Sequence, residues 1–111
     1  MAEARRSSVD LVHDVSADVA EEFGALRRAI EEAGPLAARY RELINVGAFT
    51  TARIPNSIKT HAGRALDAGA TPAELRQAVL LALAATTGVG PTADALRCIE
   101  EVVASRPAAS G

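Results

Sequence analysis

Residues 57–75 have the sequence SIKTHAGRALDAGATPAEL, and this stretch predicts the end of one helix and the beginning of the next. Gly69 stands where a helix favours a residue with a left-handed backbone after its last turn. Thr71 and Glu74 have the spacing of a capping box, and Pro72 between them suits the first helical position. The stretch therefore predicts two helices joined by a tight turn, and it favours an all-α fold.

Hydrophobic residues recur at spacings of three and four on both sides of this stretch, which is the period of a helix with one apolar face. The spacing predicts five helices, and four of them lie at residues 9–32, 35–52, 72–86, and 91 or 92 to 105. The third carries His61, ends at Gly69 and is expected to be capped by Asn56 or Ser57. In the second helix the residues expected to face inward are Leu36, Tyr40, Leu43 and Ile44, with Val46 left open. No segment alternates with a period of two for long enough to predict a strand.

The composition favours one domain with a core of small aliphatic side chains. Hydrophobic residues make up 49% of the 111 residues, but only 3% are aromatic. Ala, Leu, Val and Ile must therefore fill the core. We expect a flexible N-terminal arm at residues 1–8, a single helical domain at residues 9–105 and a flexible tail at residues 106–111.

Charge and cysteine content exclude several classes of partner. The formal net charge is −2 and the pI is about 5.6, which argues against nucleic acid as a partner. No segment approaches the roughly 18 apolar residues of a membrane span, and the charged N-terminus is not followed by the apolar core of a signal peptide. Cys98 is the only cysteine, so no internal disulfide is predicted and a cytoplasmic location is expected.

Two apolar surfaces predict association of the chain with itself. One is a stripe that runs along the first predicted helix from Val12 to Ile30, and the other is the helix at residues 72–86, which is apolar on nearly all sides. A monomer would expose more apolar surface than soluble monomers usually do. We therefore expect a homo-oligomer.

His61 is the leading candidate for a catalytic residue on these helices. It lies near Ala62 and Ala65 on the third predicted helix, so its ring should border the core, where a histidine can transfer protons near neutral pH. The alternative is a structural histidine whose ring donates to a backbone carbonyl and fills space. Glu42, on the second predicted helix, is open to two interpretations as well, a working carboxylate or a solvated one.

No metal site and no phosphate site is predicted. Asp10, His13 and Asp14 fall within one helical turn, but such groups at an exposed helix start are common by chance. The glycines at 88 and 90 follow a helix rather than a strand, unlike the glycines of a phosphate-binding loop. Cys98 fits a buried, inert thiol that packs as a small hydrophobic residue.

The chain also carries a series of spaced motifs. They are Arg41-Glu42-Leu43-Ile44, His61, the segment ALDAGATPAEL at residues 65–75, and Gly90-Pro91 after the fourth predicted helix. This pattern covers roughly residues 23–103 and resembles the carboxymuconolactone decarboxylase family, which includes the alkylhydroperoxidase AhpD type. The resemblance implies an AhpD-like helical domain that works as a trimer, or as a dimer or hexamer of such units.

In the AhpD type, the resemblance implies, a glutamate and a histidine relay protons to a pair of cysteines in a CxxC motif. Glu42 matches that glutamate and His61 that histidine, whereas the two cysteine positions fall on Ile54 and Ser57. Neither residue can form the thiolate, sulfenic acid or disulfide that peroxide reduction requires. An AhpD-like peroxidase activity is therefore disfavoured.

The decarboxylase type, by the same resemblance, needs no cysteine. Its chemistry is loss of CO₂ from a carboxylated unsaturated lactone, followed by protonation of the extended enolate, which requires a general acid and donors for the carboxylate and oxyanion. We expect His61 as the acid/base and Glu42 as the residue that orients it. The candidate substrate-binding residues are Arg53, Ser57 and Arg64, and no cofactor is expected.

Three functional interpretations follow. The first is a cofactor-free decarboxylase or proton-transfer enzyme that uses His61 and Glu42 on a small molecule. The second is a non-catalytic family member that serves as an oligomeric binding or structural unit. The third is a redox enzyme that relies on Cys98 or on a partner's cysteine.

Overall fold

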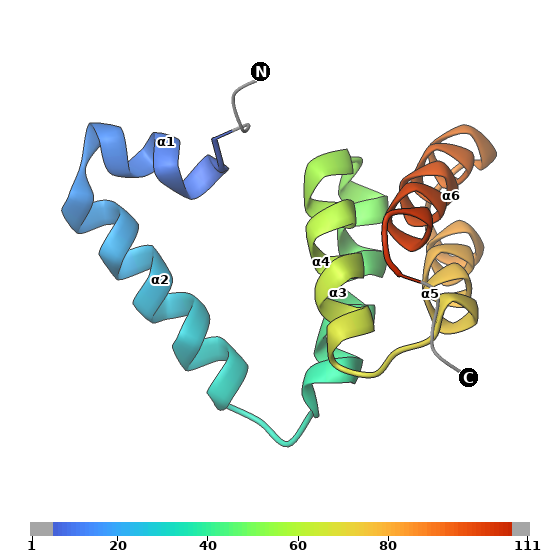
Figure 1. Ribbon diagram of the computed structural model, residues 1–111, viewed down its shortest axis with the longest axis horizontal. Coiled ribbons are helices and arrows are strands. Elements are labelled where there is room, and N and C mark those ends of the chain that lie inside the picture. The colour runs from blue at the N-terminus through green and yellow to red at the C-terminus, as the bar shows by residue number, and fades with distance from the viewer. Residues whose placement is uncertain (1–5, 108–111) are drawn as a thin grey trace. The chain divides into compact units, whose positions relative to one another are not determined.

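The computed structural model describes residues 6–107, and all the regular secondary structure in that part of the chain is helical (Figure 1). The helices are α1 (Ser8–Val15), α2 (Ala17–Glu32), α3 (Ala38–Ala52), α4 (Pro55–Asp67), α5 (Pro72–Ala85) and α6 (Val89–Ala104). The predicted all-α fold class is confirmed. The number of helices in residues 6–107 is six rather than the predicted five, because the first predicted helix is two helices.

The chain divides into two compact units, Met1–Pro35 and Leu36–Gly111. Unit 1 contains α1 and α2, which pack on each other, and unit 2 contains α3 to α6, which share one core. This boundary falls inside residues 9–105, which we expected to form a single domain. Residues 1–5 and 108–111, which include most of the predicted arm and tail, lie outside the described residues.

Unit 1 is interrupted at Ser16, which ends α1 and begins α2. Its backbone is extended, with φ −155° and ψ 112°, and its hydroxyl accepts a hydrogen bond of 3.2 Å from the amide of Val19. A capping box formed by Ser7 and Asp10 begins α1. The prediction of one helix over residues 9–32 was therefore wrong. Apolar spacing continues across the break, so it did not reveal the cap at Ser16.

Unit 2 is an arrangement of four helices around an aliphatic core. Helix α3 packs against α4 and α5, and α6 packs against the same two helices, so each helix has two main neighbours (Figure 1). The largest fully buried side chains are Leu75, Ile99, Val46, Val79 and Thr50. Small residues such as Ala62 and Ala65 are also fully buried, and they let the helices approach closely. The predicted aliphatic core is confirmed for this unit.

The turn between α4 and α5 has the predicted geometry. Gly69 has φ +99°, in the region that favours glycine. The Thr71 hydroxyl accepts from the Glu74 amide at 3.1 Å, while the Glu74 carboxylate accepts from the Thr71 amide at 2.9 Å. Pro72 is the first residue of α5. These predictions are confirmed because each depends on contacts within a few residues of sequence.

Other helix boundaries and faces differ from the predictions. Helix α4 begins at Pro55 with Ile54 as its N-cap, so neither Asn56 nor Ser57 caps it. Helix α3 begins at Ala38 rather than at residue 35, and α6 begins at Val89 rather than at residue 91 or 92. Three of the residues expected to face inward are exposed, namely Leu36, Tyr40 and Ile44. Val46 and Thr50 are instead the fully buried residues of α3, which packs against α4 and α5.

Arg106, the first residue of the predicted tail, contacts α4. Its guanidinium donates to the Asp67 carboxylate at 2.6 Å and to the carbonyl oxygen of Gly63 at 2.8 Å. These bonds connect the end of α6 to the end of α4. Among the described residues, none of the helices combines the length and the apolar character that crossing a membrane would require.

Candidate functional site

The packing of α3 against α4 brings together the two residues that the sequence singled out. Nδ1 of His61 and Oε2 of Glu42 are 2.5 Å apart, and only 11% and 10% of the two side chains are exposed. A carboxylate can only accept, so Nδ1 carries the hydrogen of this bond when Glu42 is ionised. The contact holds the imidazole ring at a fixed orientation.

Phe49 contacts the face of the His61 ring. Its ring stacks on the His61 ring with centroids 4.9 Å apart and an interplanar angle of 26°. Glu42 and Phe49 lie seven residues apart on α3, which is about two helical turns, so both project from the side of α3 that meets α4. The imidazole is therefore fixed by one hydrogen bond at its edge and by one stacking contact on its face.

The second ring nitrogen of His61, Nε2, makes no hydrogen bond to another described side chain or backbone group. In the part of the chain that the structure describes, the only fully enclosed side-chain nitrogen or oxygen without a hydrogen-bond partner is Nε of Arg41. The Nε2 atom of His61 has no partner among the described hydrogen bonds, so it keeps contact with solvent. Nδ1 is thus bonded to Glu42, whereas Nε2 makes no hydrogen bond within the described residues.

The three predicted substrate-binding residues are placed differently. Ser57 lies four residues before His61 on α4 and Arg64 lies three residues after it, so all three share one side of the helix. Arg64 is exposed and Ser57 is partly buried. Arg53 instead ends α3 with a left-handed backbone, φ 60°. It lines a separate cavity.

That separate cavity has a volume of about 170 Å³ and lies between the end of α3, the beginning of α4 and α6. Its lining includes Arg53, Thr50, Ile58 and Cys98, but not His61. The structure therefore brings Ser57 and Arg64 to the side of the helix that carries His61, and it does not bring Arg53 to the lining of a shared cavity with it.

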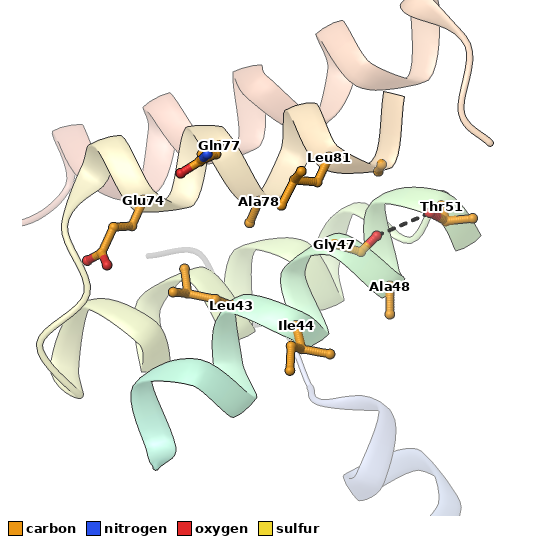
Figure 2. A pocket seen from close by; sticks show the side chains of 10 residues that line it. Leu43, Ile44, Gly47, Ala48, Thr51, Glu74, Gln77, Ala78 and Leu81 are labelled. Atoms are coloured by element: carbon orange, nitrogen blue, oxygen red, sulfur yellow. Dashed lines mark hydrogen bonds between the residues drawn. The ribbon is translucent and has the colours of Figure 1, made fainter. Parts of the chain in front are cut away.

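An apolar groove between α3 and α5 was not predicted from the sequence. It has a volume of about 470 Å³, and Figure 2 shows the side chains that line it. Gly47 and Ala78 let the two helices approach, since a Cβ at Gly47 would lie 3.5 Å from the carbonyl oxygen of Ala78. The sequence signal was the pair Gly47-Ala48, but two small residues alone do not show which helices meet.

Comparison with protein-family models places this arrangement in a known family. The model described as the carboxymuconolactone decarboxylase family matches residues 17–101. The chain belongs to the carboxymuconolactone decarboxylase family. Comparisons with curated proteins and with solved structures gave no significant match. The resemblance inferred from the motifs around His61 is thereby confirmed.

Within this family, the chain has a cysteine that is poorly suited to redox chemistry. Cys98 is buried on α6, and burial raises the pKa of its thiol above the ordinary value. A raised pKa lowers the fraction of thiolate, which is the reactive form. Ile54 caps α4 and Ser57 lies in its first turn, so the positions that match a CxxC motif carry no thiol. Among residues 6–107, no three His, Cys, Asp or Glu side chains come together in a way that could hold a metal ion.

Proposed function

We propose that this protein is a cofactor-free decarboxylase or proton-transfer enzyme that acts on a small carboxylated lactone. The observation that carries the proposal is the buried contact of 2.5 Å between Nδ1 of His61 and Oε2 of Glu42, which leaves Nε2 free. A histidine oriented by a carboxylate is a common form of general acid/base. Family membership supports the reaction class, because the family is named for such a decarboxylation.

The proposed reaction needs one proton transfer at Nε2. The bond between the lactone ring and its carboxylate carbon breaks, CO₂ leaves, and the electron pair enters the ring as an extended enolate. The imidazolium of His61 donates its Nε2 proton to the carbon that must be protonated, while Nδ1–H stays bonded to Glu42. Water then returns a proton to Nε2, so the enzyme is restored without an external oxidant or reductant.

The proposed substrate site lies on the side of α4 that carries His61. Arg64 offers a guanidinium for the substrate's carboxylate, and Ser57 offers a hydroxyl. Both lie about one helical turn from His61, which suits a substrate of a few ångströms in length. Arg53 lines the cavity beside Cys98 instead, so we assign it a weaker effect on substrate binding than Arg64.

The test is the release of CO₂ from carboxymuconolactone, with the product followed by NMR in D₂O. His61→Gln should lower kcat by about 10²–10⁴-fold, the usual contribution of a general acid. The amide of glutamine can still donate to Glu42, so the fold should be kept, but it cannot carry the proton. Deuterium at the newly formed C–H bond should disappear in parallel.

His13→Gln is the matched control, since His13 is the other histidine and is exposed on α1. It should leave kcat unchanged. Glu42→Gln should cause a smaller loss than His61→Gln, because the imidazole ring keeps a hydrogen-bond partner that orients it and loses only the charge of that partner. Full activity of the His61→Gln variant would remove His61 from the mechanism.

A second candidate function is a non-catalytic oligomeric binding unit. It is favoured by the lining of the groove between α3 and α5 and of the cavity beside Cys98, because neither includes His61 or Glu42. In that case the His61–Glu42 contact is structural. Wild-type protein that neither releases CO₂ nor incorporates deuterium would favour this function. An AhpD-like peroxidase remains disfavoured, and peroxide should leave the Cys98 thiol titre unchanged.

A further inference from the structure

The cavity beside Cys98 lies within unit 2, and three helices enclose it. The end of α3, the beginning of α4 and the first half of α6 surround a volume of about 170 Å³. Because these segments are distant in sequence, the cavity exists only through the packing of α6 and α3 against α4. Neither His61 nor Glu42 lines it, so an inference about this cavity holds whether or not His61 is catalytic.

Arg53 is the charged residue of the lining whose side chain has no partner. Its guanidinium makes no hydrogen bond or ion pair with another described residue. Asp94, which also lines the cavity, pairs with Arg97, so its charge is balanced. The hydroxyl of Thr50 donates to the carbonyl oxygen of Val46 at 2.8 Å. Of the charged and hydroxyl groups named here, the Arg53 guanidinium is therefore the one with donors left for a ligand.

The backbone of Arg53 makes an arginine a costly choice at this position. Its φ of 60° lies in the left-handed region, and among the described residues it is the only one other than glycine with a positive φ. Helices commonly end on glycine in this conformation, since a Cβ strains it. Glycine would make the same turn more easily, which indicates that the arginine side chain has a role besides ending α3.

The rest of the lining is largely apolar and uncharged. Ile58 and Ala95 are 3% and 1% exposed, and Pro55 adds its ring at the beginning of α4. Burial raises the pKa of the Cys98 thiol, so the thiol is uncharged near neutral pH and does not repel an anion. A guanidinium beside an apolar wall suits a molecule with a carboxylate at one end and a short hydrocarbon chain at the other.

We propose that the cavity beside Cys98 binds a short aliphatic carboxylate and that Arg53 binds its carboxylate group. The volume limits the length of the ligand. At about 30 Å³ per water molecule, the cavity has the volume of roughly six waters, which corresponds to an acid of about three to five carbons. Inorganic phosphate has the charge but no hydrocarbon to pack on Ile58 and Ala95, so it should bind more weakly.

Titration of the full chain with sodium butyrate, at constant ionic strength and followed by amide NMR spectra, tests the proposal. The amides of Arg53, Ala95 and Cys98 should shift together along one saturable curve. The dissociation constant should be on the order of 1 mM, as expected for so small a ligand. Butyramide has nearly the same size and no charge. It should bind at least about tenfold more weakly, because the charge-assisted hydrogen bonds are lost.

Three glutamine variants separate the arginines. Arg53→Gln removes the charge but keeps a long polar side chain, and it should weaken butyrate binding at the cavity amides by at least about tenfold. The matched control is Arg28→Gln, which removes an exposed arginine of α2 that does not line the cavity. It should keep the wild-type affinity. Arg64→Gln, on the side of α4 that carries His61, should keep that affinity as well.

The thiol of Cys98 provides a second measurement, since it is the only cysteine of the chain. Butyrate at about ten times its dissociation constant should slow the alkylation of Cys98 by iodoacetamide about tenfold in wild type, because the bound ligand covers the thiol and stabilises the folded state. In Arg53→Gln the same butyrate concentration should slow the reaction by about twofold or less, since the affinity is lower.

Any one of three results would overturn the proposal. The first is the absence of a saturable shift at the cavity amides up to about 50 mM butyrate, roughly fifty times the expected dissociation constant. The second is unchanged butyrate affinity in Arg53→Gln, or equal affinity for butyramide. The third is phosphate binding as tight as that of butyrate, which would exclude an aliphatic ligand. Circular dichroism of each variant shows whether the helices are intact, so a loss of binding without loss of helix is attributable to the side chain.

Discussion

Units 1 and 2 are built from the same kind of amphipathic helix, yet they bury their apolar residues to very different extents. In unit 2 each helix has two main neighbours, and residues such as Leu75 and Ile99 are completely buried. Unit 1 has two helices that pack on each other, and Ala20 is the only buried residue described there. An apolar stripe therefore does not ensure a core. A core requires enough helices to enclose the stripes from several sides.

The largest expected difference between the units concerns leucine truncation. Leu75→Ala should lower the free energy of unfolding by about 2–5 kcal/mol, because Leu75 is 0% exposed and its removal leaves a cavity. Leu11→Ala in unit 1 should change it by less than about 0.5 kcal/mol, because Leu11 is 55% exposed. Urea unfolding followed by circular dichroism measures both. Equal effects would mean that unit 1 has a core of its own.

Glycine replacement sharpens the comparison at two turns. Gly69→Ala should cost about 1–2 kcal/mol, because φ +99° is strained for any residue with a Cβ. Gly34→Ala, between α2 and α3, should change stability by less than about 0.5 kcal/mol, since its Cβ meets nothing within 4 Å. Thermal unfolding of the two variants provides the measurement. A larger effect at Gly34 would contradict the assignment of Gly69 as the conformationally demanding turn.

Capping residues offer a smaller contrast. Thr71→Ala removes the hydroxyl that caps α5 and should cost about 1 kcal/mol of global stability. Ser7→Ala removes the equivalent cap of α1. It should lower the helix content of unit 1 without moving the main unfolding transition, because α1 contributes no buried residue. Amide hydrogen exchange measures the opening of α1 and of α5 separately. If Ser7→Ala speeds exchange in α5 as much as in α1, this expectation is wrong.

The smallest expected effect is the response to acid. Arg106 lowers the pKa of Asp67, and Arg76 lowers the pKa of Glu100. Folded-state pKa values below the unfolded ones give stability that is present above the ordinary carboxyl pKa and is lost as the pH falls through that range. Stability should therefore decline between about pH 5 and pH 3.

The combined variant Asp67→Asn and Glu100→Gln should flatten part of that decline, and the effect should be modest because both carboxylates are exposed. Asp10→Asn is the control in unit 1, where the Ser7 cap also lowers the pKa of the carboxyl. It should leave the main profile as it is. Urea midpoints measured across this pH range check both, and an unchanged slope in the combined variant would contradict the role of these ion pairs.

Much of the local structure was predictable from the sequence. The turn at Gly69, the capping box of Thr71 and Glu74, and the helical class follow from interactions within a few residues. The cap at Ser16 is also local, but the apolar spacing from Val12 to Val19 continues across it and conceals it. Periodicity is therefore a weaker guide to helix boundaries than capping residues are.

The candidate site was predictable as a set of residues but not as a geometry. His61 and Glu42 were named from their types, positions and family resemblance, whereas their separation of 2.5 Å depends on how α3 packs against α4. Phe49 was not named, because nothing in its local sequence shows that its ring will stack on His61. The α3/α5 groove was missed for the same reason, since it forms only where two helices distant in sequence approach.

The sequence by itself determined that this chain is helical, that a turn at Gly69 separates two of its helices, and which family it belongs to. Those properties depend on backbone preferences, caps and motifs that act over a few residues. Only the tertiary structure decided which apolar faces are enclosed. Val46 and Ile44 are close neighbours on α3, but one is fully buried and the other is exposed. That choice belongs to the packing of four helices around one core, because burial is a property of all the surfaces that meet.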